Sequence, residues 1–561
     1  MKAYKLLLLL LLAIFLTSCG KKPDTIYING KFYTLDKDNT IVDAVATGDG
    51  KIIALGKSVD LAQKYPKAKV VDLNGKTVVP GFIDAEGNLM EFSRNLNFID
   101  LRGTKTLAEI LNKVSERIRT AKENEWIGGF GWDDQVLSQT ELDRIDHKLL
   151  DSLTTKQYIY LVNSRADMVW VNKKMMDAAN INKNTPNPED GEVEKDDKGE
   201  PTGILYDDAQ ELIIKVLPKP TIPEIEQNIM RGNTELFRYG ITEVCDANIS
   251  EDILNVYKKM VDENTFLIRL YVMVNGKDSL FGTYMQKGPE VYKDHIIVKC
   301  VFLEYDGYFE TQDAAMENDY IEEPHRKTPY NDEYDIREMT KKAFEKNFQV
   351  SIKANGDRAV TATLRAIDSV SKETKNKAGR TRIEYLEFVP PEDMAKIKQL
   401  EIIPSIRPEV TLENKRVVND IINPDNGKNL GLWNTLLKQN GIIMSGSDFP
   451  YHQINPLYQM YMLSTGLPLD TAYSRTANNI QQKLSVLDAL KSFTVWAAYG
   501  CFEDDVKGTL EPGKLADMVV LSNDILESDP KVLLTTNVLM TIIRGEIVYN
   551  SHKPAAMLIP N

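Results

Sequence analysis

Histidine and cysteine, the usual ligands of a catalytic transition metal, are few and widely scattered in this chain. The five histidines are His147, His295, His325, His452 and His552. The cysteines that follow residue 20 are Cys245, Cys300 and Cys501. None of these spacings matches a zinc site, so the cysteines are predicted to be small buried apolar residues. His452 lies four residues after Asp448. As a lone loop histidine it is interpreted as a packing or surface residue, and entry into the same pocket as Asp448 is the alternative.

Residues 78–88 form a more informative segment, which reads Val-Val-Pro-Gly-Phe-Ile-Asp-Ala-Glu-Gly-Asn. It resembles the amidohydrolase superfamily signature Pro-Gly-Phe-Ile-Asp-x-His-x-His, whose two histidines bind a divalent metal through neutral imidazole nitrogens. Glu86 and Asn88 stand in the two histidine places. The fold that the resemblance implies can be carried over, but the metal chemistry cannot simply be copied with it.

Further motifs follow in an order that resembles amidohydrolase family 3, from about residue 24 to the C-terminus. They lie at residues 129–133, 201–205, 240–244, 306–307, 356–360, 382–384, 446–450 and 508–517. Each motif is short, but a colinear set of this length predicts the fold. The resemblance implies a hydrolase of non-peptide carbon–nitrogen bonds that uses one or two zinc or similar divalent ions.

The metal positions of the family map onto other residue types here. The bridging lysine, carbamylated in many members, maps to Phe302, and aligning Lys299 instead requires a three-residue slip. Two further ligand histidines map to Lys353 and Tyr385. Only the last ligand, an aspartate that commonly also serves as general base, is unchanged, as Asp448. No metal or other cofactor is therefore expected.

Two further family histidines map to Asp167, on the substrate side of an insertion, and to Cys245. Trp132, in the motif at residues 129–133, is interpreted as packing that insertion. Stacking of a ligand on its indole is the alternative.

Without a metal, Glu86 and Asp448 would be adjacent buried carboxylates whose repulsion raises at least one pKa. We predict that the Lys353 ammonium pairs with both of them in the volume that a metal would take. Phe302 would fill space there, and Tyr385 would donate a hydrogen bond. An organic cation would then replace the metal.

Two alternatives to this arrangement stay open. In the first, the same residues only repack the centre of the fold. In the second, Glu86, Asp167 and Asp448 bind calcium or magnesium through oxygen ligands. The ammonium of Lys353 argues against the second, because it would compete for the same oxygens.

Three functions are compatible with these residues. The preferred one is a metal-free barrel that binds a small polar, zwitterionic molecule, or a partner protein in the cell envelope, through Glu86, Asp167, Lys353, Tyr385 and Asp448. The second is a metal-independent enzyme in which Lys353 is base or Schiff-base nucleophile and Tyr385 is acid, with Asp448 or Glu86 as partner. The third is a divergent hydrolase of amides, formamides or cyclic ureas, which requires Lys299 as the carbamylated lysine.

The elements that position these residues are predicted to be those of an α/β protein with a (β/α)8 TIM-like barrel over 80–499. Predicted barrel strands are 78–83, 242–245, 267–272, 296–302, 349–353, 382–386, 402–405 and 442–445. An insertion over about 90–230 is predicted to carry helices and a hairpin and to roof the barrel mouth. Residues 24–79 and 500–561 are predicted to form one small β-sandwich, with Asn29-Gly30 as a hairpin turn.

Residues 1–18 resemble a bacterial lipoprotein signal peptide, because two lysines and the apolar run 6–16 precede Leu-Thr-Ser-Cys. The resemblance implies a lipid anchor on Cys19, a tether over 19–23 and a place in the bacterial envelope, with the outer membrane as the default. The formal charge of −14 has no basic stripe beside it, which disfavours nucleic acid as a partner.

Overall fold

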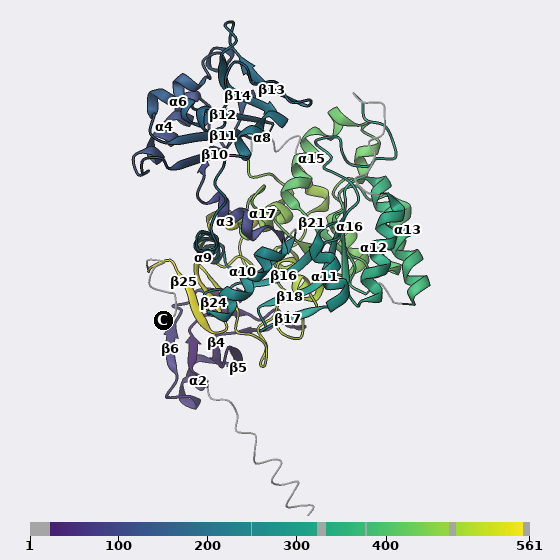
Figure 1. Ribbon diagram of the computed structural model, residues 1–561. Helices are drawn as coiled ribbons and strands as arrows, with labels where there is room; N and C mark the ends of the chain where they lie inside the picture. The colour runs from purple at the N-terminus through teal and green to yellow at the C-terminus, as the bar shows by residue number, and fades with distance from the viewer. Residues whose placement is uncertain are drawn as a thin grey trace, which may run out of the picture. The chain divides into compact units, whose positions relative to one another are not determined.

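A computed structural model of the protein describes residues 23–165, 167–247, 249–321, 332–375, 379–470 and 478–553. The chain divides into two compact units. One comprises the residues up to Met90 and those from Gly232 onward, and the other is Glu91–Arg231. Figure 1 shows the elements of both units along the chain. Cys19 lies outside the described residues, and none of the described helices is long and apolar enough to cross a membrane.

The first unit is built on an eight-stranded parallel sheet that curls into a nearly closed barrel, which confirms the predicted fold class. In spatial order its strands are β22 (Met444–Ser445), β21 (Ile403–Ile406), β20 (Arg382–Tyr385), β19 (Gln349–Ala354), β18 (Ile296–Glu304), β16 (Arg269–Asn275), β15 (Ile241–Ala247) and β8 (Phe82–Gly87). A short strand, β17 (Glu290–Tyr292), pairs antiparallel with β18. The barrel closes between β8 and the end of β22, where the Asp448 amide donates to the Glu86 carbonyl at 3.0 Å.

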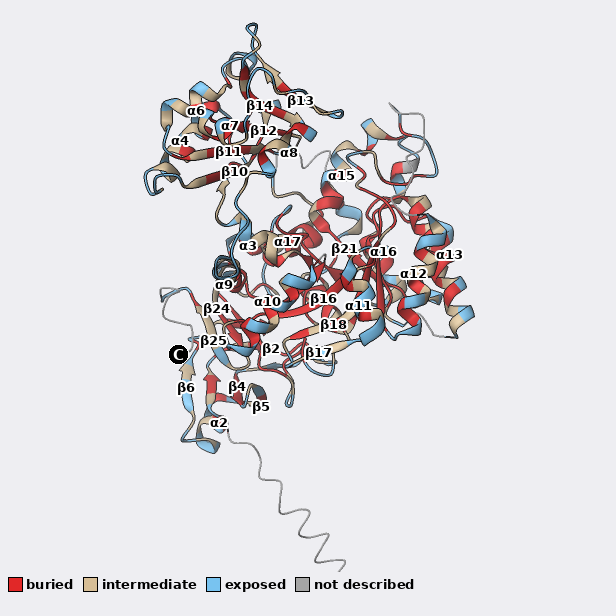
Figure 2. Ribbon diagram, viewed as in Figure 1, coloured by how far each residue is buried: buried red, intermediate tan, exposed pale blue. Residues whose placement is uncertain are grey.

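Helices follow the barrel strands, as expected for parallel βα units. They are α9 (Ile222–Arg238), α10 (Glu251–Asp262), α11 (Ser279–Lys287), α12 (Glu333–Glu345), α13 (Asp357–Thr374), α14 (Met394–Gln399), α15 (Pro408–Ile421), α16 (Trp433–Asn440), α17 (Pro456–Thr465), α18 (Val486–Ser492) and α19 (Val495–Gly500). Figure 2 shows the buried strands β16 and β18 beside α11, a helix that is partly exposed.

The remaining strands of this unit come from both ends of the chain and form two sheets. One contains β5 (Lys51–Gly56), β4 (Ala44–Gly48), β1 (Thr25–Ile28) and β6 (Lys69–Asp72). The other contains β25 (Glu546–Asn550), β24 (Val538–Ile543), β23 (Met518–Leu521), β7 (Thr77–Pro80), β2 (Lys31–Tyr33) and β3 (Ile41–Val42). Both sheets contribute to one apolar cluster, in which Tyr27 and Val45 pack with Phe32 and Met518.

Two local predictions in this region were wrong. The Asn29-Gly30 pair is not a hairpin turn, because β1 and β2 belong to different sheets and the chain passes between the sheets at this point. The strand predicted over 78–83 is two strands, β7 and β8, divided at Gly81. A Cβ on Gly81 would lie 2.5 Å from the Thr242 hydroxyl, so only glycine allows this close approach to β15.

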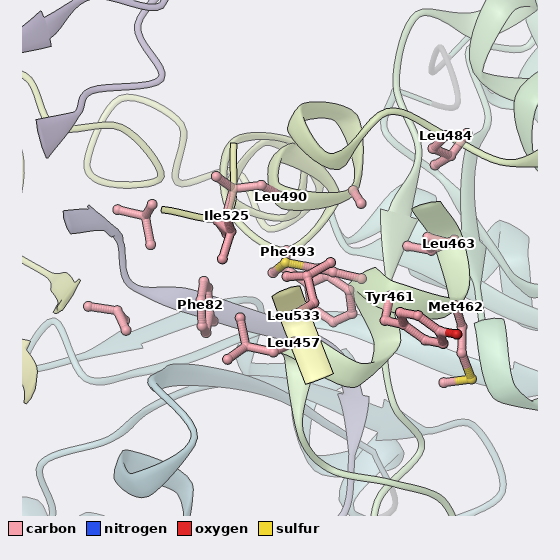
Figure 3. Close-up of a cluster of buried hydrophobic side chains, with 14 of the residues drawn as sticks. Phe82, Leu457, Tyr461, Met462, Leu463, Leu484, Leu490, Phe493, Ile525 and Leu533 are labelled. Atoms are coloured by element: carbon pink, nitrogen blue, oxygen red, sulfur yellow. The ribbon is translucent and has the colours of Figure 1, made fainter. Parts of the chain in front are cut away.

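A second apolar cluster joins α17 and α18 to the strands of the larger sandwich sheet. Figure 3 shows Leu457, Tyr461 and Leu490 packed close to Phe82 and Phe493. Burial of this kind contributes about 1.5–3 kcal/mol for each large apolar side chain. The cluster therefore stabilises the segment between β22 and β23 against the rest of the unit.

The second unit is a six-stranded mixed sheet with helices. Its strands, in spatial order, are β13 (Gly191–Lys195), β14 (Pro201–Asp207), β12 (Met168–Val171), β11 (Tyr158–Asn163), β10 (Trp126–Trp132) and β9 (Ile99–Asp100). Its longest internal helix is α4 (Leu107–Ile118), whose first turn is capped by Thr106. Strands β13 and β14 pair antiparallel, which confirms the hairpin predicted within the insertion.

Candidate functional site

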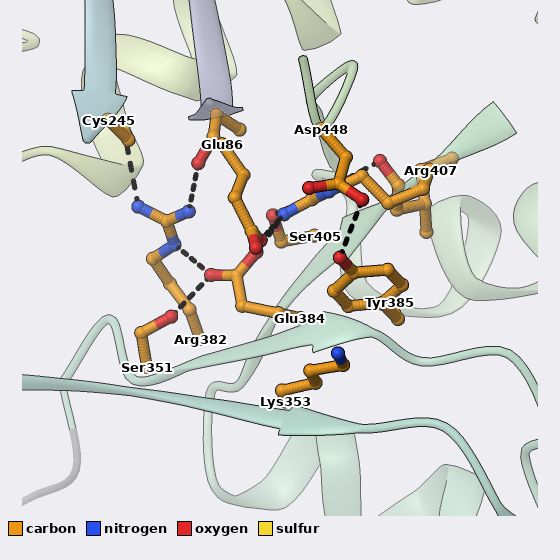
Figure 4. Close-up of polar contacts among 12 residues, drawn as sticks. Glu86, Cys245, Ser351, Lys353, Arg382, Glu384, Tyr385, Ser405, Arg407 and Asp448 are labelled. Carbon is orange, nitrogen blue, oxygen red and sulfur yellow. Dashed lines mark hydrogen bonds and ion pairs between the residues drawn. The ribbon is translucent and has the colours of Figure 1, made fainter. Parts of the chain in front are cut away.

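The carboxyl ends of four barrel strands bring a set of charged side chains into the barrel interior. Glu86 comes from β8, Lys353 from β19 and Glu384 from β20, while Arg407 directly follows β21. All four are at least nine-tenths buried. Figure 4 shows that Glu86, Glu384 and Arg407 point toward one another, while Lys353 lies apart from them.

Arg407 is the cation at the centre of this set. One of its guanidinium nitrogens, Nη2, contacts Glu86 Oε2 and lies 2.6 Å from Glu384 Oε2. The other, Nη1, donates to Ser405 Oγ at 3.2 Å. The side chains of Arg407, Glu86 and Glu384 are 1%, 8% and 0% exposed. A permanently charged guanidinium therefore joins two carboxylates in a nearly water-free volume.

Arg382 extends the network on the other side of Glu384. Its Nε lies 2.7 Å from Glu384 Oε1, and its Nη2 donates to the Ala85 carbonyl at 2.6 Å. Burial alone would raise the pKa of Glu384, but the Arg382 and Arg407 guanidinium groups hold it at about 2. Burial raises the pKa of Glu86 to about 7, because it outweighs the single guanidinium of Arg407. Glu384 is thus the fixed anion, and Glu86 titrates near neutral pH.

Lys353 does not make the predicted pair with Glu86 and Asp448. Its ammonium lies 3.5 Å from the centre of the Tyr308 ring and 4.9 Å from that of Tyr385. The nearest carboxylate, Glu304 on neighbouring strand β18, is 3.9 Å away. The side chain of Arg407 is longer and forked, and it reaches the carboxylates of Glu86 and Glu384 from the end of β21. The organic cation among these carboxylates is therefore Arg407 rather than Lys353. Sequence reasoning missed it, although an arginine at the carboxyl end of a predicted strand was the available signal.

Asp448 lies at the centre of a second polar group. Its Oδ2 accepts a hydrogen bond from the Tyr385 hydroxyl at 2.9 Å, as predicted for Tyr385 as a donor. The same oxygen lies 3.4 Å from His452 Nδ1, and His452 Nε2 lies 3.2 Å from Glu413 Oε2. Tyr385 and Asp448 both have positive φ, of 67° and 62°. Such backbone strain in residues other than glycine is typical of functional sites.

His452 lies against Asp448, which favours the alternative left open by the sequence over an ordinary packing or surface residue. Burial alone would lower its pKa, but hydrogen bonds to Asp448 and Glu413 raise the pKa well above 6.5. Burial also raises the pKa of Tyr385 well above 10, so its hydroxyl keeps the proton that it donates to Asp448. At neutral pH, Asp448 thus lies between a cationic imidazole and a neutral phenol.

The other predicted barrel residues have simpler environments. Phe302 is 2% exposed and packs with Tyr271 and Cys300 in the barrel interior, where it fills space as predicted. Asn88 is half-buried, and its backbone amide donates to the Phe449 carbonyl at 2.9 Å. The ammonium of Lys299 lies 4.0 Å from the centre of the Phe502 ring.

Asp167 and Trp132 belong to the second unit. Asp167 accepts from Arg165 Nε at 2.8 Å, and its side chain is 39% exposed. Trp132 is fully buried, and its indole nitrogen donates to the Leu161 carbonyl at 3.2 Å. The indole is packed inside that unit, as interpreted from the sequence, and stacking of a ligand on it stays a prediction.

The residues present do not fit a divalent metal. No group of three or more histidine, cysteine, aspartate or glutamate side chains is arranged as a metal site in the described part of the chain. The carboxylates of Glu86 and Glu384 already contact the Arg407 guanidinium, which would repel a dication at the same oxygens.

Glu387, which lies just beyond β20, should make the stability of the protein depend on pH. It is 1% exposed, accepts from the Thr411 hydroxyl at 2.8 Å, and burial raises its pKa from 4.5 to about 8. Between these two pKa values the folded protein holds a proton that the unfolded chain has released, so stability falls as pH rises from about 5 to 8. Each tenfold difference in proton affinity corresponds to about 1.4 kcal/mol.

We expect Glu387→Gln to reduce this loss of stability by a few kcal/mol, because glutamine keeps the acceptor for Thr411 but cannot ionise. Urea denaturation at pH 5 and pH 8 measures the difference. The exposed Glu392→Gln is the matched control. An unchanged pH dependence in Glu387→Gln would show that Glu387 is already ionised in the folded state.

A (β/α)8 barrel that carries charged residues at the carboxyl ends of its strands, with two further sheets built from the chain ends, has the architecture of a TIM-barrel enzyme. Comparison with known proteins identifies the branch. Residues 69–549 match amidohydrolase family 3, so the chain belongs to this amidohydrolase family.

Curated relatives span nearly the whole chain. Protein LONG AFTER FAR-RED 3 of Arabidopsis thaliana is 27% identical, over 94% of this chain and 92% of its own. The putative amidohydrolase YtcJ of Bacillus subtilis is 26% identical over 93% and 99%, and the N-substituted formamide deformylase of Arthrobacter pascens is 23% identical over 94% and 98%. An uncharacterized metal-dependent hydrolase of Pyrococcus horikoshii has the same fold, with a TM-score of 0.73 and 23% identity over 90% and 99% of the chains.

Proposed function

We propose that this protein is a metal-independent member of the amidohydrolase family that binds a small polar molecule at the carboxyl ends of the barrel strands. One observation carries the proposal: the buried guanidinium of Arg407 joins Glu86 and Glu384. This cation supplies the charge compensation that a divalent ion would otherwise give to the two carboxylates. The barrel can thus keep its fold and its polar interior without a metal.

The chemistry of the ligand follows from Lys353. Its side chain is 5% exposed, and its ammonium makes no hydrogen bond to any residue that the structure describes. A buried ammonium has three donors to satisfy, so a ligand with a carboxylate or another anionic group fits this position. The Tyr308 and Tyr385 rings beside the ammonium would cover the apolar part of such a ligand.

The opposite charge of a zwitterionic ligand is best matched by acidic groups near Lys353. Glu304 Oε1 lies 3.9 Å from the Lys353 ammonium, and the hydroxyl of Tyr308 lies 3.3 Å from that of Tyr385, which contacts Asp448. These groups place negative charge and hydrogen-bonding oxygens beside the ammonium. A molecule with both an acidic and a basic group is therefore the preferred ligand class.

A second candidate function is metal-independent catalysis, and one set of contacts favours it. Asp448 lies between the Tyr385 hydroxyl and the His452 imidazole, an arrangement that can hold and transfer a proton. Lys353 would then be a base or a Schiff-base nucleophile beside this relay. The two functions differ in one respect, since a binding protein releases its ligand unchanged and an enzyme releases a product.

Native mass spectrometry of the purified protein tests both functions. We expect a co-purifying molecule whose mass adds to that of the polypeptide and which is recovered unchanged after denaturation. Recovery of a chemically altered molecule after incubation would favour catalysis instead. A protein that carries nothing and retains no member of a panel of amino acids and small carboxylates would contradict the binding proposal.

The cellular setting also stays a proposal. The resemblance of residues 1–18 to a lipoprotein signal peptide supports a lipid anchor on Cys19 and a place in the bacterial envelope. A partner protein in the envelope is compatible with this setting. Metabolic labelling with a fatty acid, with Cys19→Ser as the unlabelled control, tests the anchor.

A further inference from the structure

The barrel interior also contains two cysteines in direct contact. Cys245 lies on β15, and Cys501 follows α19. Their sulfur atoms are 3.3 Å apart, and both residues are fully buried. Cys300 belongs to the same apolar cluster, and its thiol donates to the Val301 carbonyl at 3.7 Å. All three cysteines are buried, as predicted.

Arg382 makes the two sulfurs chemically unequal. Its Nη1 donates to Cys245 Sγ at 3.5 Å. Burial alone would raise the pKa of Cys245, but hydrogen bonding to Cys501 and the charge of Arg382 lower it overall, whereas burial raises the pKa of Cys501. Cys245 is thus the better thiolate and Cys501 holds its proton, which is the division of roles that disulfide formation requires.

We propose that Cys245 and Cys501 form a reversible disulfide that cross-links the barrel at the place where it closes. Helix α19 packs against β8 and β22, the two strands between which the barrel closes, and β15 pairs with β8 on its other edge. Strand β22 has only two residues, and an isolated bridge between Gly87 and Phe449 completes the closure. A covalent link from β15 to the end of α19 would span the junction between β8 and β22, which few hydrogen bonds hold together.

The step needs an oxidant, which we take to be a small-molecule disulfide such as oxidised glutathione. The Cys245 thiolate attacks one sulfur of the oxidant, forms a mixed disulfide and releases one thiol. Cys501 then loses its proton, attacks Cys245 Sγ and releases the second thiol. The two protein thiols together lose two electrons and two protons, and these convert the oxidant into two thiols. The sulfurs must approach by about 1.3 Å to reach bonding distance.

The bond would close a long loop, since the two cysteines are separated by 256 positions in the sequence. Cross-links across long loops restrict the unfolded chain most, so the oxidised protein should be the more stable form. The bond would also remove the thiolate character beside Arg382, which holds Glu384 of the charged network shown in Figure 4.

The experiment compares the full chain after reduction with the same protein incubated with oxidised glutathione. Thiols are alkylated after denaturation and counted by intact mass, and peptide mapping locates the cross-link. We expect two fewer alkylated thiols, a peptide pair joined through Cys245 and Cys501, and a higher Tm for the oxidised wild type. Because both sulfurs are buried, oxidation is also carried out during refolding from urea.

Three single variants make the assignment specific. Cys300→Ser should keep the cross-link and the shift in Tm, whereas Cys245→Ser and Cys501→Ser should each lose both. The comparison of oxidised with reduced wild type needs no variant, so a folding defect in one of them does not obscure the answer. An unchanged number of thiols under both oxidation conditions, or a cross-link that includes Cys300, would overturn the proposal.

Discussion

Replacing Arg407 with methionine is expected to lower the free energy of unfolding by about 3–5 kcal/mol. Methionine approximates the size of the side chain but leaves Glu86 and Glu384 without the guanidinium that contacts both. An unpaired carboxylate that is almost fully buried costs far more than an exposed one, because little water can reach it. Urea denaturation at pH 7.5 measures the effect.

The matched control for this variant is Arg365→Met. Arg365 pairs with Glu333 at 2.8 Å, but the two side chains are 57% and 41% exposed. Surface pairs of this kind contribute at most about 1 kcal/mol. Adding Glu86→Met to Arg407→Met should restore part of the stability, since Glu384 keeps Arg382. If Arg407→Met cost no more than Arg365→Met, the central role of the guanidinium would be contradicted.

Lys353→Met is expected to lose most of its affinity for the ligand, which is the second large effect. The variant removes the ammonium that we propose pairs with an anionic ligand, while keeping the apolar stem beside Tyr308. Truncating one side of a buried charge pair costs about 2–5 kcal/mol of binding free energy, a factor of roughly 30 to several thousand in Kd. Native mass spectrometry should therefore find the variant without the molecule that co-purifies with the wild type.

Two further variants separate binding from folding at this position. Lys353→Arg keeps the positive charge and should retain measurable binding, while Lys372→Met, at a side chain that is 74% exposed, should bind as the wild type does. The melting temperature of Lys353→Met provides the check on folding. Undiminished ligand in a folded Lys353→Met protein would locate the binding site elsewhere.

Much of the fold could be predicted because its signals are local. The barrel strands are short apolar runs followed by helical patterns, and the β13–β14 hairpin has a polar turn between two strands. The Asn29-Gly30 turn failed for the opposite reason. The dipeptide fixes a local change of direction, but the choice between pairing β1 with β2 and sending them to separate sheets depends on distant strands.

The site was predicted less well than the fold, and the reasons are geometric. Substitution at the family ligand positions correctly pointed to Glu86, Tyr385 and Asp448 as neighbours of the barrel interior. The identity of the cation depended on which long side chain reaches across the barrel, which sequence spacing does not encode. Arg407 was therefore missed, and His452 was interpreted first as a packing or surface residue, because neither occupies a position that the resemblance marks as a ligand.

The most direct test of the account is the metal content of the purified protein after growth in zinc-supplemented medium, measured by elemental mass spectrometry. Because Arg407 already neutralises the carboxylates of Glu86 and Glu384, we predict zinc, manganese and nickel each far below one ion per chain. One or two tightly held ions per chain, the number that a catalytic site of this fold class would hold, would contradict the proposal of a metal-independent barrel.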